Sequence, residues 1–180
     1  MTKIYTFDGI INPSKTHIAR KGSGVNESTN PNYNNNLVEL TTEEYSVIST
    51  TNGKVGVSCS FLKSTSALFC KFKLDIYSIN NIKLQFIAEA APGSVWNVLE
   101  WNGEKWNQRF STNQLVSSGV MQEVELINNV QEDKYLTFAI PIRNILISTN
   151  DPFNYYSGVK LLVDTPIQYG EDKLSIYWEL

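Results

Sequence analysis

The chain has 180 residues, a formal net charge of −3 and a composition that is 42% hydrophobic and 12% aromatic. The length and the hydrophobic content predict one packed domain over residues 1–180. The acidic balance excludes a broad positive surface, so we expect neither nucleic acid nor an anionic membrane as a partner. No apolar run approaches the roughly 20 residues of a membrane span, and "MTKIYTFDGI" lacks the order of a signal peptide.

Apolar and polar residues alternate in short runs separated by Asn, Gly, Ser and Pro, which is typical of half-buried strands. In chain order this pattern predicts strands at 3–7, 15–20, 36–40, 44–50, 54–62, 67–75, 81–89, 94–101, 104–110, 121–127, 134–140, 158–164 and 173–179. Residues 22–36 and 148–158 are predicted surface loops. Residues 141–148 are the best candidate for one or two helical turns, with a strand as the alternative. Regular strand spacing with almost no helix predicts an all-β fold, an antiparallel β-sandwich of the jelly-roll type.

The stretch "VGVSCSFLKSTSALFCKFKL" predicts a hairpin centred between Ser64 and Thr65. In that register Cys59 lies opposite Cys70, and every pair on their face of the hairpin is apolar. We therefore expect two buried thiols side by side in the core, with a cross-strand disulfide as the alternative.

Residues 95–107, "VWNVLEWNGEKWN", hold three of the four tryptophans around one Asn-Gly pair. Asn-Gly between alternating apolar residues predicts a two-residue hairpin turn at 102–103. One face of this hairpin is expected in the core: Val95, Leu99, Trp101, Trp106 and Phe110.

The other face of the same predicted hairpin places Trp96 opposite Arg109. Two interpretations stand. Arg109 stacks on the Trp96 ring and covers it, or Trp96 forms a sugar platform with Arg109 and Lys105 as a cationic rim.

Catalytic motifs are scarce. His17 is the only histidine, which leaves little basis for Ser-His or Cys-His chemistry. No zinc or nucleotide-binding motif occurs, and no spacing of acidic residues selects a glycosidase pair. We therefore expect that the protein is not an enzyme. Structural calcium is the one cofactor left open, through aspartates near predicted strand ends: Asp8, Asp75, Asp151 and Asp164.

Three segments resemble a known family. "NPNYNNNLVEL" at 30–40 is similar to its Asn-x-Asn-Tyr loop and following strand, "ALFCKFKLDIYSINNIKLQFIAEAA" at 67–91 to its strand pair, and "GSVWNVLEWNGEKW" at 93–106 to its Trp-bearing strand. Together they resemble the DNRLRE-type carbohydrate-binding modules over about a third of the chain. The segment at 41–60 is longer than the family's usual connection. The resemblance implies a jelly-roll sandwich that binds a polysaccharide without catalysis.

Two functions are compatible with these observations. The first is a carbohydrate-binding module that grips a polysaccharide or cell-surface glycan through aromatic and polar or basic residues: Trp96, Arg109, Lys105, Tyr33, Tyr155 and Tyr156. The second is a structural or adhesive module, for example of a phage tail fibre or surface appendage, whose aromatics contact other protein subunits. Under either hypothesis we expect an extracellular, surface-exposed or virion-associated protein within a larger assembly.

Overall fold

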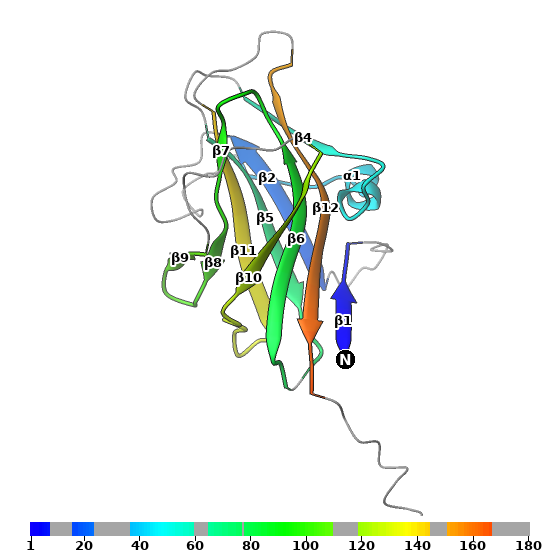
Figure 1. Ribbon diagram of the computed structural model, residues 1–180, viewed down its shortest axis with the longest axis vertical. Helices are drawn as coiled ribbons and strands as arrows, with labels where there is room; N and C mark the ends of the chain where they lie inside the picture. Colours follow the sequence, from blue (N-terminus) through cyan, green and yellow to red (C-terminus); the bar gives the residue numbers. More distant parts are fainter. Residues whose placement is uncertain are drawn as a thin grey trace, which may run out of the picture.

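The computed structural model describes residues 1–7, 16–23, 37–59, 65–76, 78–109, 119–144 and 151–166. These fold into two antiparallel β-sheets packed as a sandwich (Figure 1). The predicted antiparallel sandwich is therefore confirmed. The predicted strand at 173–179 and residues Asp8, Tyr33 and Phe110 lie outside the described ranges.

The first sheet has five strands: β1 (Thr2–Tyr5), β4 (Val55–Ser58), β6 (Asn81–Glu89), β10 (Met121–Leu126) and β12 (Phe153–Asp164). Their order is β1-β12-β6-β10, and β4 also pairs with β12. β1 pairs with residues 161–164 of β12, whereas β4 pairs with residues 153–156. β12 therefore joins two short strands to the rest of the sheet.

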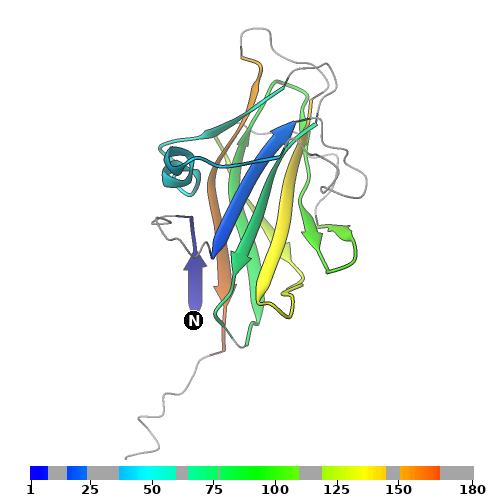
Figure 2. The ribbon, with the colours of Figure 1, turned by 180° about the vertical axis from the view of Figure 1, so that it is seen from behind.

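The second sheet has seven strands: β2 (His17–Ser23), β3 (Val38–Glu39), β5 (Thr65–Lys73), β7 (Val95–Trp96), β8 (Leu99–Trp101), β9 (Trp106–Gln108) and β11 (Tyr135–Arg143). Their order is β3-β2-β5-β11-β8-β9, and β7 also pairs with β11. Figure 2 shows the outer side of this sheet, with β2, β5 and β11 side by side and the β8–β9 hairpin at one edge.

The core fills the space between the two sheets, because each long strand alternates buried and more exposed residues. Phe72 of β5 stacks with Phe138 of β11 at 5.9 Å between ring centroids. Phe86 of β6 meets Trp96 of β7 edge to face at 5.1 Å. The second contact joins the two sheets, since β6 and β7 belong to different layers.

A short helix, α1 (Thr42–Ile48), replaces the strand predicted at 44–50. Thr41 and Glu44 form a capping box in which each side chain accepts a hydrogen bond from the other's backbone N–H. Tyr45 and Ile48 are the buried residues of the helix, which lies beside the edge of the sandwich (Figure 1). The strand prediction was wrong because the apolar spacing was assigned to a strand while the capping signal "TTEE" was passed over.

The predicted hairpin between residues 55–59 and 65–74 is wrong. β4 pairs with β12 in the five-stranded sheet, whereas β5 pairs with β2 and β11 in the seven-stranded sheet. Both segments alternate in the same way because they face one core from opposite layers. Cys59 and Cys70 are nevertheless both buried and neither is in a disulfide. The predicted burial is confirmed, whereas their pairing across a hairpin and the disulfide alternative are wrong.

Two further predictions are decided by β11 and β12. Residues 141–143 are the end of β11, so the strand alternative holds for them and the helical one is wrong. Residues 153–158, predicted as loop, are the first half of β12. Pro141 is accommodated in a strand, and the two adjacent tyrosines of β12 point to opposite faces. No helix in the described part of the chain is long and apolar enough to cross a membrane.

Candidate functional site

The β8–β9 hairpin closes with a longer turn than the sequence predicted. Trp101 pairs with Trp106, so residues 102–105 form the loop instead of the Asn-Gly pair alone. The Asn102 side chain accepts hydrogen bonds from the backbone N–H groups of Glu104 and Lys105, at 2.9 and 2.8 Å. Gly103 adopts a positive φ of 97°. The side-chain hydrogen bonds of Asn102 therefore stabilise a four-residue loop, and the predicted register is wrong by two residues.

The face of the β8–β9 hairpin that points into the core is also the opposite of the predicted one. Val98 and Glu100 are fully buried, whereas Leu99, Trp101 and Trp106 are half-buried on the outer side. The sequence predicts Leu99, Trp101 and Trp106 on the buried face of the hairpin, and this assignment of the faces is wrong.

Glu100 can be buried because its carboxylate has hydrogen-bond donors. The backbone N–H of Ile127 lies 3.0 Å from Oε1, and the Asn129 side chain donates to Oε2 at 3.0 Å. Burial raises the pKa of the Glu100 carboxyl above its ordinary value, and these two donors and the nearby Arg109 act in the opposite direction. Glu100 thus ties the hairpin to the residues that follow β10.

The inverted hairpin places an aromatic cluster on the outer face of the seven-stranded sheet. The rings of Trp101 and Trp106 lie 5.3 Å apart with an interplanar angle of 52°. Phe69 of β5 approaches Trp106 edge to face at 6.2 Å. Three aromatic rings from three strands are therefore gathered at one surface.

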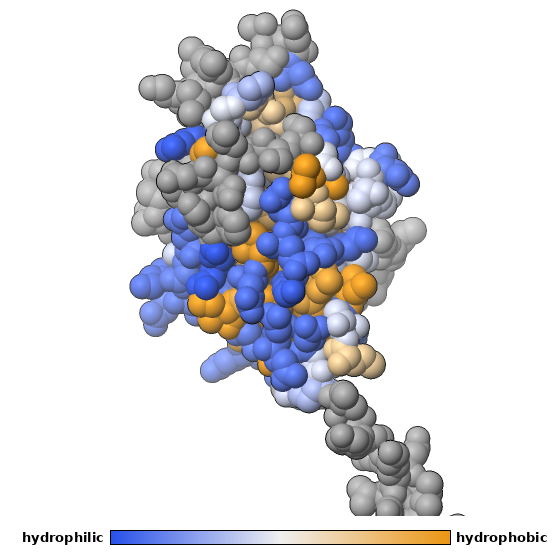
Figure 3. All heavy atoms as spheres, in the orientation of Figure 1, coloured by the Kyte–Doolittle hydropathy of each residue, from blue (hydrophilic) through white to orange (hydrophobic). Residues whose placement is uncertain are grey.

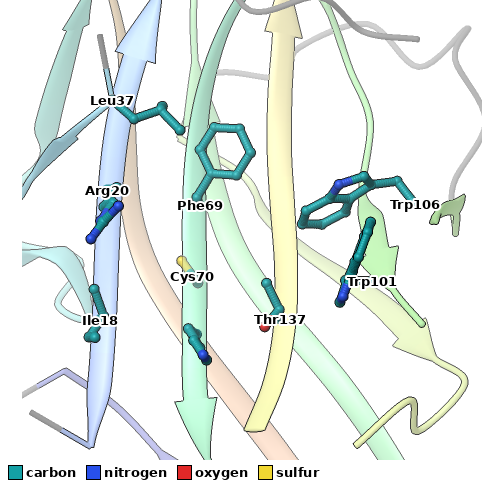
Figure 4. Close-up of a pocket in the computed structure, with 9 residues that line it drawn as sticks. Ile18, Arg20, Leu37, Phe69, Cys70, Trp101, Trp106 and Thr137 are labelled. Carbon is teal, nitrogen blue, oxygen red and sulfur yellow. The ribbon is translucent and has the colours of Figure 1, made fainter. Parts of the chain in front are cut away.

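These rings form one side of a groove with a volume of about 400 Å³. The two indoles lie over one side, Arg20 and Ile18 of β2 lie on the other, and Phe69 and Thr137 lie between them (Figure 4). Leu37 and Lys71 also line the groove. The groove therefore combines flat apolar rings with a hydroxyl, a guanidinium and an ammonium group.

The strand register explains why these residues meet. Arg20 pairs with Phe69 across β2 and β5, and Lys71 pairs with Thr137 across β5 and β11. Residues opposite one another on neighbouring strands point to the same face of a sheet. The groove thus crosses the strands, running from β2 to the β8–β9 hairpin.

The outer face of the five-stranded sheet has a different character. Lys83 pairs with Glu123 at 3.0 Å, and Lys54 pairs with Glu89 at 2.9 Å. The space-filling view of this side is mostly hydrophilic, with small separate apolar areas (Figure 3). Paired charges in alternation are typical of an ordinary solvated sheet face. This side also carries one aromatic pair, Phe153 and Tyr155 of β12, whose ring centroids lie 6.1 Å apart.

Two of the residues predicted to bind a ligand are in the core. Trp96 is 1% exposed and packs on Phe86, so its placement on the outer face is wrong. Tyr156 is 0% exposed and donates a hydrogen bond from its hydroxyl to the carbonyl of Ile140 at 2.8 Å. The Tyr156 prediction assumed a loop at 148–158, and the Trp96 prediction assumed the opposite orientation of the hairpin. Neither ring is available to stack on a ligand.

The other predicted site residues are dispersed. Tyr155 lies on the outer face of the five-stranded sheet, with the Lys54 ammonium 4.1 Å from its ring centroid. Lys105 is exposed in the 102–105 loop, and Arg109 is half-buried with its Nε enclosed and without a partner. Tyr33 lies outside the described residues. The structure therefore does not bring the predicted set together.

The groove residues that the sequence interpretation missed carried a weak signal. Phe69 and Lys71 alternate with the buried Leu68, Cys70 and Phe72 of β5, so they belong to the outer face. An aromatic residue beside lysines on an exposed strand face was the available clue. Trp101 and Trp106 were assigned to the core because an apolar face is normally the buried one.

The aspartates considered for calcium serve other contacts. Asp75 accepts hydrogen bonds from Lys3 and Tyr5, and Asp164 accepts one from Thr2. Asp151 accepts one from the Tyr155 hydroxyl. Within the ranges that the structure describes, no group of three or more His, Cys, Asp or Glu residues could hold a metal ion.

Comparison with known proteins adds no family to this picture. No protein-family model matches the chain, and no curated protein matches it.

Proposed function

We propose that the protein is a non-catalytic carbohydrate-binding module whose ligand lies in the groove on the seven-stranded sheet. The observation that carries this proposal is the pair of half-buried indoles, Trp101 and Trp106, at the side of a groove of about 400 Å³. Aromatic side chains that line a concave surface together with a few polar groups are typical of ligand sites. The proposal keeps the predicted function and replaces the predicted residues.

The chemistry of the groove suits a sugar. The C–H face of a pyranose ring packs on an indole, and its hydroxyls need short polar partners. Thr137 supplies a short hydroxyl between the two sides of the groove, and Arg20 supplies a guanidinium on the side opposite the indoles. A few convergent polar groups among aromatic side chains are typical of small-molecule sites.

We also propose that the sandwich is of the jelly-roll type, as the resemblance to DNRLRE-type modules implies. From β4 to β12 the chain alternates between the two sheets, when β7, β8 and β9 are counted as one visit to the seven-stranded sheet. This alternation supports a jelly roll. The resemblance supports a binding module, but it does not select the ligand.

A glycan array followed by calorimetric titration tests the proposal, each with calcium and with a chelator. We expect saturable binding of an oligosaccharide at one site per chain. Trp106→Ala and Trp101→Ala should each weaken binding by about 30-fold, as truncating a central tryptophan of a binding site costs about 2 kcal/mol.

Tyr155→Ala is the matched control, because it removes a partly exposed aromatic ring from the opposite face. It should leave the affinity unchanged. The proposal is wrong if no oligosaccharide binds, or if both indole variants fold and bind normally. A stable oligomer that covers the groove, without glycan binding, would instead favour the adhesive module.

A further inference from the structure

We propose that the groove selects acidic saccharides, whose carboxylate or sulfate groups bind Arg20 and Lys71. This inference rests on the proposed function and adds the chemical class of the sugar. Two observations carry it: the positions of the two cations in the groove, and the lack of an ion-pair partner for either of them among the described residues.

Arg20 and Lys71 are diagonal neighbours on the adjacent strands β2 and β5, and both line the groove. Arg20 is directly opposite Phe69 on the neighbouring strand, and Lys71 is the next outward-facing residue after Phe69. Such diagonal neighbours lie roughly 7–8 Å apart, and their Cβ atoms are somewhat closer. Two cations at this separation can hold one anionic group or two successive ones along a sugar chain.

Neither cation has a carboxylate partner within the described part of the chain. Lys71 instead lies with its ammonium 4.3 Å from the centroid of the Tyr135 ring, which leaves its N–H groups free to donate. Glu39 stands opposite Arg20 in β3, but its Oε1 accepts a hydrogen bond from the Tyr45 hydroxyl at 3.0 Å. Glu39, the acidic residue nearest to Arg20 by register, is therefore hydrogen-bonded to Tyr45.

Other lysines of the protein show the contrast. Their ion-pair partners lie within 3.0 Å and are Asp75 for Lys3, Glu89 for Lys54 and Glu123 for Lys83. Lys73 and Lys160 also form no ion pair among the described residues, but neither lines the groove. Arg20 and Lys71 are the two cations among the described residues that line it.

The indole pair and the two cations together account for selectivity toward acidic sugars. A neutral sugar would stack on the indoles and leave both cations hydrated. An acidic sugar would stack in the same way and also accept charge-assisted hydrogen bonds, which are about twice as strong as neutral ones. Affinity for the acidic sugar should therefore depend on ionic strength, because exposed charges are screened by salt.

The experiment is a calorimetric titration of the full chain with two probes of equal length, an oligogalacturonate and a neutral oligogalactose. We expect the oligogalacturonate to bind at least about tenfold more tightly than the neutral probe. This factor corresponds to the net contribution of one charge-assisted hydrogen bond. The preference should fade as ionic strength rises from about 0.01 M to about 1 M, where the Debye length falls from about 30 Å to about 3 Å.

Arg20→Gln and Lys71→Gln should each reduce affinity for the oligogalacturonate by about tenfold and leave the neutral probe's affinity unchanged. Lys160→Gln is the matched control, since it removes one positive charge from the opposite sheet. It should not change the preference.

The outcomes separate this inference from the proposed function. If both probes bind equally and Trp106→Ala weakens both, the carbohydrate site stands and acidic selectivity is overturned. If the oligogalacturonate binds but Lys160→Gln weakens it as much as Arg20→Gln does, the attraction is non-specific and the inference is again overturned. If neither probe nor any sugar on the array binds, both proposals are wrong.

Discussion

Trp96 and Trp101 are close in sequence and belong to consecutive strands, yet they occupy different environments. Trp96 is 1% exposed and packs between the sheets, whereas Trp101 lines the outer groove. The difference follows from the alternation of side chains along the segment, because residues 96, 98 and 100 face inward. A single satisfied carboxylate, Glu100, permits this orientation of the hairpin.

The first prediction concerns this difference in packing. Trp96→Ala should destabilise the protein by about 3–5 kcal/mol, because it leaves a large cavity in the core. Trp101→Ala should cost clearly less, since its ring already contacts solvent. Chemical denaturation of the two variants measures the free energies of unfolding. Equal costs for both would contradict the assignment of the faces.

The second prediction concerns the protonation of Glu100. Its folded-state pKa is raised above the ordinary value of 4.5, so the unfolded chain releases this proton more easily than the folded chain. The stability that Glu100 contributes is fully present below the ordinary pKa and is lost as the pH rises through the raised folded pKa.

Glu100→Gln isolates this contribution, because glutamine does not titrate. The unfolding free energy of the wild type minus that of the variant should fall as the pH rises from about 4, just below the ordinary carboxyl pKa. Denaturant titrations of both proteins across this range provide the measurement. A difference that stays constant or rises with pH would show that the carboxyl is not perturbed in this direction.

At the scale of elements, the β8–β9 hairpin depends on its 102–105 loop. Gly103 has a φ of 97°, a region that side chains with a Cβ disfavour. A Cβ at this position would also lie 2.5 Å from Oε1 of Gln131. The loop therefore constrains the residue both through its backbone and through a neighbouring side chain.

The third prediction separates these two effects. Gly93 also has a positive φ, of 84°, but a Cβ there would meet nothing within 4 Å. Gly93→Ala should cost about 1–2 kcal/mol for the backbone alone, and Gly103→Ala should cost more. In a Gln131→Ala background the two costs should converge. Thermal or urea unfolding tests this, and a lower cost at Gly103 than at Gly93 would contradict it.

The start of helix α1 is specified by its local sequence, and its buried face makes tertiary contacts. Its capping box fixes its start, and its buried Tyr45 accepts a hydrogen bond from the Ala19 backbone at 2.9 Å. The same hydroxyl donates to the β2–β3 edge through Glu39. Tyr45 thus links α1 to β2 through Ala19 and to β3 through Glu39.

At the scale of the whole molecule, the two sheets are joined by polar as well as apolar contacts. Asn144 follows β11 of one sheet, and Asn154 lies in β12 of the other. Their buried carboxamides exchange hydrogen bonds at 2.7 and 2.9 Å. Asn154 also donates to Ser66, which extends this link between the layers.

The fourth prediction tests this link. Asn144→Ala and Asn154→Ala should each destabilise the fold by about 1–3 kcal/mol, because each leaves buried polar groups of its partner unsatisfied. The double variant should lose less than the sum of the two, since the second change removes a group already without its partner. A double-mutant cycle by denaturant unfolding measures the coupling, and strict additivity would show that the pair is not energetically linked.

The sequence alone determined the architecture and most strand positions, because alternation of apolar and polar residues has a local cause in strand geometry. The segments at 81–89 and 121–127 illustrate this, since β6 and β10 coincide with the predicted ranges to within one residue. Sequence also indicated that both cysteines are buried.

Tertiary structure alone decided which strands pair and which hairpin face is buried. Alternation is the same whether two strands lie side by side or face each other across a core, which is why β4 and β5 were mistaken for partners. The orientation of the tryptophan hairpin depends on Glu100 meeting donors at residues 127 and 129, and no local pattern encodes that contact. The groove also depends on tertiary structure. Its indoles, Arg20 and Lys71 come from three parts of the chain that only the sheet register brings together.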